Sequence, residues 1–133
     1  MDLKLELLLI PVSDVDRAKA FYVENAGFRL DVDHQPNDDF RVVQMTPPGS
    51  ACSITIGIGV TEAAPGSYRG THLVVYDIDI AVDRLRGAGV EFERYEQGPI
   101  ETNEKGIANP GGGGPRIAWF KDPAGNILSV LEN

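Results

Sequence analysis

Val12-Ser13-Asp14-Val15-Asp16-Arg17-Ala18 returns 63 residues later as Val75-Tyr76-Asp77-Ile78-Asp79-Ile80-Ala81 in a chain of 133 residues. In each copy an apolar run precedes the segment, and a helix-like run, a Gly and a second apolar run follow it. A solenoid needs about three or more copies to bury its faces, so a unit repeated once is too few. Two copies instead indicate two half-sheets that complete each other around a cavity.

The first copy predicts a strand, a helix and three more strands. Ser13-x-x-Asp16 is typical of a helix start, in which the Ser hydroxyl caps a free amide. Gly27 is placed to end this helix. The polar stretch 34–39 is predicted to be a turn. The expected strands are Leu3 to Val12, Phe28 to Asp33, Phe40 to Met45 and Ala51 to Val60.

The second copy predicts the same order after a connector at about 61–69. Asp77 is the expected helix cap, and Gly89 follows an amphipathic stripe that ends there. A glycine-rich loop is expected from Gly98 to Pro115, and a tight turn from Asp122 to Asn126. The expected strands are Thr71 to Tyr76, Val90 to Tyr95, Arg116 to Phe120 and Ile127 to Leu131.

This pattern predicts an α+β fold made of two βαβββ modules, which form a curved, cup-like mixed sheet with the helices outside. Module one covers about 1–62 and module two about 70–133, within a single domain of residues 1–133. Hydrophobic residues make up 42% of the chain and charged residues 24%, as in ordinary globular proteins.

Charge and cysteine content narrow the possible partners. The net charge of −8 argues against nucleic acid or an anionic membrane, since phosphate binding needs clustered Lys and Arg. An acidic surface either attracts a cationic small molecule or serves solubility alone. Cys52 is the single cysteine, which excludes an internal disulfide and a cysteine-based zinc site. Without a signal peptide or an apolar span of ~20 residues, the sequence predicts a cytoplasmic protein.

The repeated helix start, Gly27-Phe28 and the turn Asp122-Pro123-Ala124-Gly125-Asn126 resemble the vicinal oxygen chelate superfamily, which contains glyoxalases, bleomycin-resistance proteins and extradiol dioxygenases. The resemblance covers almost the whole chain. It implies a homodimer, and it implies a divalent metal held by His and Glu from four strands. That metal would chelate two neighbouring substrate oxygens and stabilise the oxyanion that forms.

The resemblance also assigns positions to the four metal ligands. Three of these positions hold Leu7, Gly70 and Ser129. The remaining ligand would come from the fourth strand of the first copy, which contains no Asp, Glu or His. His72 is the only imidazole near the pattern, and one neutral His cannot hold a divalent ion. We therefore expect no metal and no other cofactor.

Without a metal, the inward positions of the same strands become the candidate ligand surface. Strand alternation and hydrogen-bonding capacity select nine side chains. They are Leu7, Leu9, Gln44, His72, Val74, Tyr76, Trp119, Ser129 and Leu131. His72 is the candidate catalytic residue, because only His titrates near neutrality without perturbation. The alternative is a buried His bonded to a backbone carbonyl.

Three functions remain open from the sequence. The first is a metal-independent binder of a small apolar or cationic aromatic molecule, similar to the bleomycin-resistance branch. The second is a metal-free isomerase, lyase or cyclase that uses His72 as acid or base. The third is a divalent-metal enzyme of glyoxalase or dioxygenase type with unusual ligands. The sequence identifies neither the ligand nor the choice between binder and enzyme.

Overall fold

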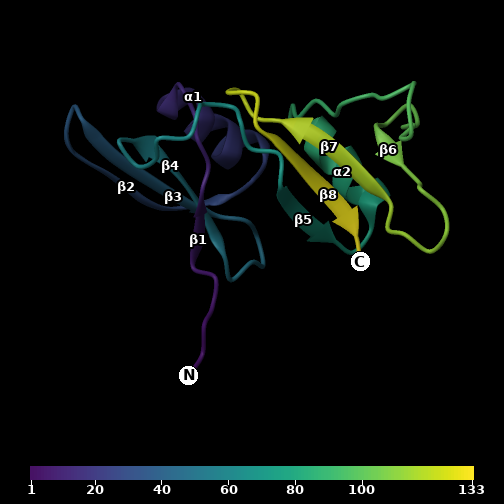
Figure 1. The fold of residues 1–133 in the computed structure, drawn as a ribbon, viewed down its shortest axis with the longest axis horizontal. Coiled ribbons are helices and arrows are strands. Elements are labelled where there is room, and N and C mark those ends of the chain that lie inside the picture. Colours follow the sequence, from purple (N-terminus) through teal and green to yellow (C-terminus); the bar gives the residue numbers. More distant parts are fainter. The chain divides into compact units, whose positions relative to one another are not determined.

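A computed structural model describes all residues, 1–133, and divides them into two compact units (Figure 1). The first unit contains residues 1–68 and 122–126, and the second contains 69–121 and 127–133. Each unit carries one four-stranded mixed sheet. The predicted α+β fold of two βαβββ modules is confirmed.

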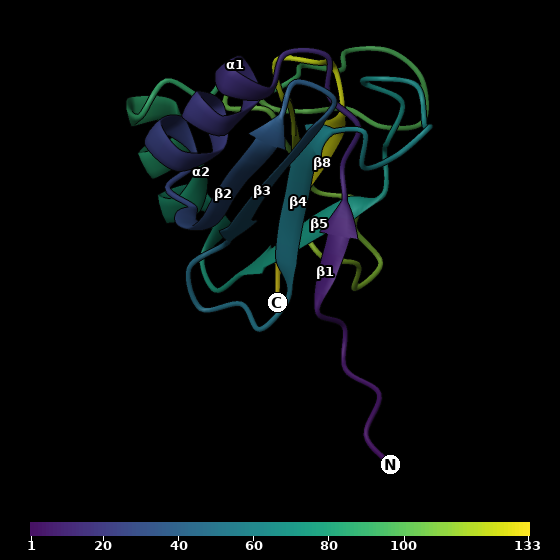
Figure 2. The same ribbon diagram turned by 90° about the vertical axis from the view of Figure 1, so that its left-hand side faces the viewer.

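The first module is built from six elements in chain order. They are β1 (Leu7–Leu9), α1 (Val15–Ala20), the π-helical turn η1 (Phe21–Asn25), β2 (Arg29–Asn37), β3 (Phe40–Thr46) and β4 (Ser53–Ile58). The sheet order is β1-β4-β3-β2, as Figure 2 shows. β1 runs parallel to β4, and the other two pairs are antiparallel.

The second module repeats this topology. Its elements are β5 (Thr71–Val75), α2 (Ile78–Gly87), β6 (Ile107–Ala108), β7 (Ile117–Lys121) and β8 (Ile127–Glu132). The sheet order is β5-β8-β7-β6, with β5 parallel to β8 and the other pairs antiparallel. Neither α1, η1 nor α2 has the length and apolar character that crossing a bilayer would require.

Both helices begin at an aspartate of the repeated segment. The Asp14 side chain accepts a hydrogen bond from the Arg17 N–H (3.1 Å), and Asp77 accepts one from the Ile80 N–H (3.2 Å). The predicted cap at Asp77 is confirmed, whereas the predicted cap at Ser13 is wrong by one residue. A carboxylate is favoured at this place because its negative charge also faces the positive end of the helix dipole.

Three predicted strands have different limits. Only Leu7–Leu9 of the stretch 3–12 pairs with β4, and the exposed residues before it form an extended arm (Figures 1 and 2). β2 continues through most of the predicted turn 34–39 because its pairing with β3 extends to Asn37 and Phe40. Residues 90–95 contribute one isolated bridge, and β6 lies inside the predicted loop.

Each sheet buries one face against its helix. In the first module the fully buried side chains Val43 and Ile56 lie on the face that α1 covers. In the second, Phe120 and Val130 lie on the face that packs on α2, which is behind β7 and β8 in Figure 1. Helix burial therefore leaves the opposite face of each sheet available for other contacts. We call these the open faces.

The predicted tight turn at 122–126 is confirmed and has a structural role. The Asp122 carboxylate accepts hydrogen bonds from the N–H groups of Ala124 and Asn126 and from the Asn126 side-chain amide (2.8 to 3.0 Å). The hydroxyl of Tyr22, a buried residue of η1, donates to the same carboxylate at 2.8 Å. Burial and the neighbouring charge of Asp122 raise the pKa of Tyr22. The side chains of this network are buried and hydrogen-bonded to one another, so we assign the turn a structural role and not a catalytic one.

Candidate functional site

The open face of the second module carries two rows of side chains that the strand register brings together. His72, Ser129 and Trp119 occupy directly paired positions on β5, β8 and β7. Residues two positions along the strands form the second row, which consists of Val74, Leu131 and Ile117. Paired positions point to the same side of a sheet. Five of the nine predicted ligand residues therefore share this face.

His72 and Ser129 form a hydrogen-bonded pair at the centre of the face. The distance between His72 Nδ1 and Ser129 Oγ is 2.5 Å, and either atom can be the donor. Ser129 is fully buried while His72 is exposed. The predicted alternative, in which a buried His72 bonds a backbone carbonyl, is wrong. The pair fixes the imidazole orientation and leaves Nε2 as the free ring nitrogen.

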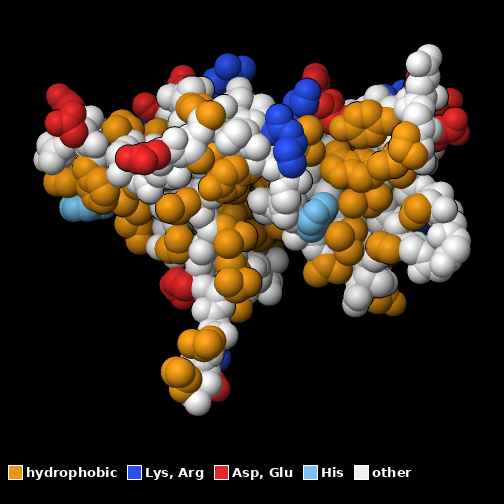
Figure 3. Space-filling model, viewed as in Figure 1, with side chains coloured by type: hydrophobic (Ala, Val, Ile, Leu, Met, Phe, Trp, Pro, Cys, Tyr) orange, Lys and Arg blue, Asp and Glu red, His pale blue; other side chains and the backbone are white.

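A pocket of about 390 Å³ adjoins this face at Trp119. Its walls are mainly apolar and come from β6, β7 and the segments before and after β6. The lining residues are Gly98, Pro99, Ile100, Glu101, Ala108, Asn109, Pro110, Ile117 and Trp119. The ring of Tyr95 packs edge-on against the Trp119 indole, with 5.6 Å between ring centroids. In Figure 3, apolar side chains gather over β7 and β8 beside a histidine.

Most of the pocket wall could not be predicted from the sequence. The predicted glycine-rich loop contains most of the lining residues, among them Pro99, Ile100, Glu101 and Asn109. The apolar pair Pro99-Ile100 inside a polar loop was the only available signal. Tyr76 follows the end of β5 and is 94% exposed, so the structure does not bring it into the pocket.

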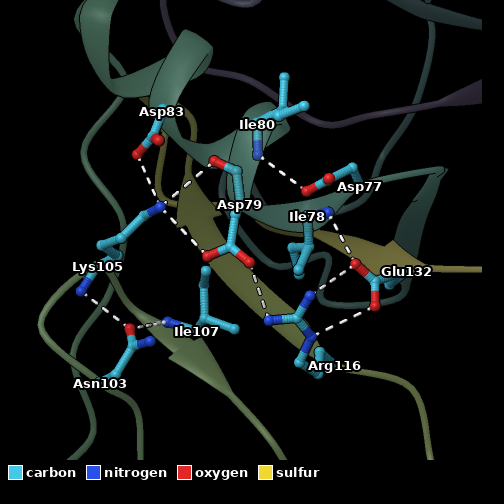
Figure 4. A network of polar contacts seen from close by, with 10 residues as sticks. All are labelled: Asp77, Ile78, Asp79, Ile80, Asp83, Asn103, Lys105, Ile107, Arg116 and Glu132. Atoms are coloured by element: carbon cyan, nitrogen blue, oxygen red, sulfur yellow. Dashed lines mark hydrogen bonds and ion pairs between the residues drawn. The ribbon is translucent and has the colours of Figure 1, made fainter.

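A network of charges at the start of α2 holds the pocket wall in place (Figure 4). Lys105 contacts Asp79 (3.3 Å) and Asp83 (2.8 Å), and Arg116 contacts Asp79 (3.0 Å) and Glu132 (2.8 Å). Hydrogen bonds from Arg116 lower the pKa of both Asp79 and Glu132. Lys105 lies between the two wall stretches 98–101 and 108–110, so these ion pairs fix the segment to α2.

The open face of the first module carries three of the other four predicted residues, and Tyr76 lies on neither face. Leu9, Thr55 and Gln44 form one row across β1, β4 and β3, and Leu7 pairs with Ser53 in the next row. The Ser53 and Thr46 hydroxyls bond each other at 2.7 Å, and Thr46 also donates to Asp31. These hydroxyl-bearing residues were missed, although the alternation of Ser53 and Thr55 within a predicted strand was a signal.

The repeat now identifies the position on β4 that the family resemblance left open. The 63-residue offset relates Leu9 to His72, and Thr55 pairs with Leu9 as Ser129 pairs with His72. The four metal-ligand positions therefore hold Leu7, Thr55, Gly70 and Ser129. Protein sites for divalent ions are built mainly from carboxylate, imidazole or thiolate side chains, and none of these residues supplies one. No group of three or more His, Cys, Asp or Glu side chains in the structure is arranged to hold a metal ion. The residues do not fit the family metal.

Comparison with known proteins adds the following similarities. Residues 4–130 match the family described as Glyoxalase/Bleomycin resistance protein/Dioxygenase superfamily. The chain is 26% identical over 132 residues to a "Probable lactoylglutathione lyase" of Vibrio parahaemolyticus serotype O3:K6 (strain RIMD 2210633), covering 94% of this chain and 87% of that protein.

Two solved structures resemble the fold at higher identity. TnmS3, described as an antibiotic binding protein from Streptomyces sp. CB03234, is 34% identical with a TM-score of 0.75, covering 98% of this chain and 96% of TnmS3. A superfamily member from Sphaerobacter thermophilus DSM 20745 is 32% identical with a TM-score of 0.73, covering 99% of this chain and 98% of the other.

Proposed function

Because the chain belongs to the Glyoxalase/Bleomycin resistance protein/Dioxygenase superfamily, we propose that it binds a small organic molecule, without a metal, on the open face of its second module. The observation that carries this proposal is the mainly apolar pocket of about 390 Å³ beside Trp119. Pockets for small molecules are usually concave and apolar with a few polar groups that orient the ligand. The similarity to an antibiotic binding protein favours the same class of ligand.

The lining residues favour an aromatic ligand. Trp119 offers an indole that Tyr95 holds from one side, which suits stacking against a planar ring. Glu101 is the charged residue of the lining, so a cationic group on the ligand would be attracted there. The His72–Ser129 pair lies in the same row as Trp119 and provides a hydrogen-bonding group next to the apolar wall.

Intrinsic fluorescence tests the binding proposal directly, since Trp119 is the only tryptophan. We expect compounds from a library of planar aromatic cations and neutral aromatics to change its emission saturably. Ile100→Asp, in the pocket wall, should weaken the binding of the neutral aromatic compounds at least tenfold, because it places a charged group in the apolar wall that they contact. Ile80→Asp, an exposed position on α2, is the matched control and should leave affinity unchanged.

The metal-free part of the proposal has its own test. Elemental analysis of protein purified without added metal or chelator should find no stoichiometric divalent metal, and EDTA should leave affinity unchanged. A bound divalent ion, or binding that requires one, would contradict the proposal and favour the metalloenzyme alternative.

A second candidate function is a metal-free isomerase, lyase or cyclase. The His72–Ser129 contact favours it, because an exposed imidazole oriented through Nδ1 can exchange a proton with a ligand at Nε2. In that case His72→Ala should abolish turnover, while ligand binding weakens by no more than the loss of one hydrogen bond, about tenfold. For a pure binder, no library compound would be converted to product by the wild-type protein.

We also propose a cytoplasmic homodimer. The edge strands β1 and β5 carry exposed apolar side chains, with Leu8 43% and Val74 64% exposed. Unpaired apolar edges are usually covered in native proteins. Light scattering after size exclusion should give twice the 14.4 kDa mass of the chain, and a monomer at all concentrations would refute the dimer.

A further inference from the structure

One buried hydroxyl in the protein has no hydrogen-bond partner. Thr55 lies on β4 and is 3% exposed, and its Oγ1 contacts no donor or acceptor. The two other buried hydroxyls on this open face, those of Ser53 and Thr46, bond each other. Buried polar side chains are nearly always paired, so Thr55 requires an explanation.

The internal repeat explains how Thr55 loses its partner. Its counterpart Ser129 is satisfied by His72 at 2.5 Å. In the first module the position of His72 is occupied by Leu9, which has no polar atom. The first module therefore has the hydroxyl on this face, but an apolar side chain at the position that would satisfy it. A valine at position 55 would have the same shape without the energetic cost of an unpaired polar group.

We propose that Thr55, together with Gln44, binds the carbonyl group of a neutral small molecule on the open face of the first module. The inference rests on the proposed function, since it names a chemical class for the small molecules that the protein binds, and it concerns the first module by itself. Gln44 is paired with Thr55 across β3 and β4, is only half-buried, and its side-chain amide makes no hydrogen bond in the protein. The Gln44 amide can therefore turn toward a ligand at the paired Thr55 position without breaking an internal hydrogen bond.

The chemistry around the two residues selects a neutral acceptor. A carbonyl oxygen has two lone pairs, and the Thr55 O–H and the Gln44 NH₂ are two donors in the same row. Leu7, Leu9 and Val32 are the apolar neighbours in these rows. A charged ligand would lose its hydration among them without gaining an opposite charge, because the Asp31 carboxylate is occupied by Thr46 and Arg29.

Matched pairs of probes test this assignment on the full chain. Acetophenone is compared with ethylbenzene, and benzophenone with diphenylmethane, by ligand-observed NMR titration. In at least one pair, we expect the carbonyl compound to bind the wild-type protein about five- to tenfold more tightly than its hydrocarbon partner. This factor corresponds to the free energy of one hydrogen bond. Thr55→Val should reduce this preference to less than about twofold, and Thr55→Ser should retain it.

Thermal unfolding of the free protein supplies the second measurement. Thr55→Val should unfold at a higher temperature than wild type, because it removes an unpaired buried hydroxyl. Ser53→Ala is the matched control: it should lower the unfolding temperature by leaving Thr46 with one partner fewer, and it should keep the carbonyl preference.

Two results would overturn the inference: a carbonyl preference that survives in Thr55→Val, or no preference in either pair with wild type. If either result appears while aromatic compounds still change Trp119 emission, Thr55 is not a ligand contact and the proposed function stands. If no compound binds at all, both proposals fail.

Discussion

Replacing His72 by Leu should reproduce in the second module the arrangement that Leu9 and Thr55 have in the first. Ser129 is fully buried and has His72 as its hydrogen-bonding side chain, so His72→Leu leaves a buried hydroxyl unpaired. Such a group costs about 1–3 kcal/mol. Because His72 is itself exposed, lost packing adds little, and we expect the free energy of unfolding to fall by about 2 kcal/mol.

A double-mutant cycle separates this cost from other effects. Adding Ser129→Ala to His72→Leu removes the unpaired hydroxyl and should restore most of the lost stability, giving a coupling energy of about 1–2 kcal/mol. Urea unfolding followed by Trp119 fluorescence suits the measurement, since Trp119 is the next residue in the same row. His34→Leu, on exposed β2, is the control and should change stability by less than about 0.5 kcal/mol. A loss below that value for His72→Leu, or no recovery in the double variant, would refute the reasoning.

Three further predictions concern other contacts of the fold. Tyr22→Phe should lower the unfolding free energy by about 2 kcal/mol at pH 7, because it removes a buried hydrogen bond to the Asp122 carboxylate. Because the pKa of Tyr22 is raised in the folded protein, its contribution to stability is complete below pH ~10 and falls progressively above it. In urea titrations the wild-type protein should therefore lose stability at alkaline pH, and Tyr22→Phe should not show this loss. An equal loss of stability in both proteins would contradict the pKa argument. Hydrogen bonds from Arg41 lower the pKa of Asp33, so its contribution is present above pH ~4 and is lost as the pH falls further. Asp33→Asn should therefore be less stable than wild type at pH 7 and lose less stability between pH 5 and pH 2, and equal acid sensitivity would disprove the assignment. Lys105→Met should speed amide hydrogen exchange in residues 98–110 while leaving β8 protected, and unchanged exchange there would mean that the charge network does not hold the pocket wall.

The internal repeat made the fold predictable because it reports directly on topology. Asp14 and Asp77 lie 63 residues apart and both cap helices, and the strands around them pair in the same order. Apolar alternation placed β3, β4, β7 and β8 to within a few residues, since their buried faces follow the period of a strand. The predicted face of His72, Ser129 and Trp119 follows from the same alternation.

The parts that the sequence did not predict depend on contacts with distant residues. β6 forms where the Asn103 side chain accepts hydrogen bonds from the N–H groups of Lys105 and Ile107 and turns the chain toward β7. Nothing in the local pattern distinguishes this stretch from an ordinary loop. Likewise, the apolar run 3–12 pairs only at Leu7–Leu9. β4 begins at Ser53, the partner of Leu7, so residues 3–6 have no partner in that strand.

The two modules carry different side chains at corresponding positions of their open faces. Leu9, Thr55 and Gln44 in the first module correspond in register to His72, Ser129 and Trp119 in the second. Packing against the helices accounts for the residues on the opposite faces, but it does not require any of these six. Apolar side chains in both rows would serve the packing of the fold equally well. Instead one row keeps an imidazole, a hydroxyl and an indole, and the other keeps an unpaired hydroxyl and an unpaired amide. Polar groups that the packing of the fold does not need are expected if each row, within its own module, contacts a ligand.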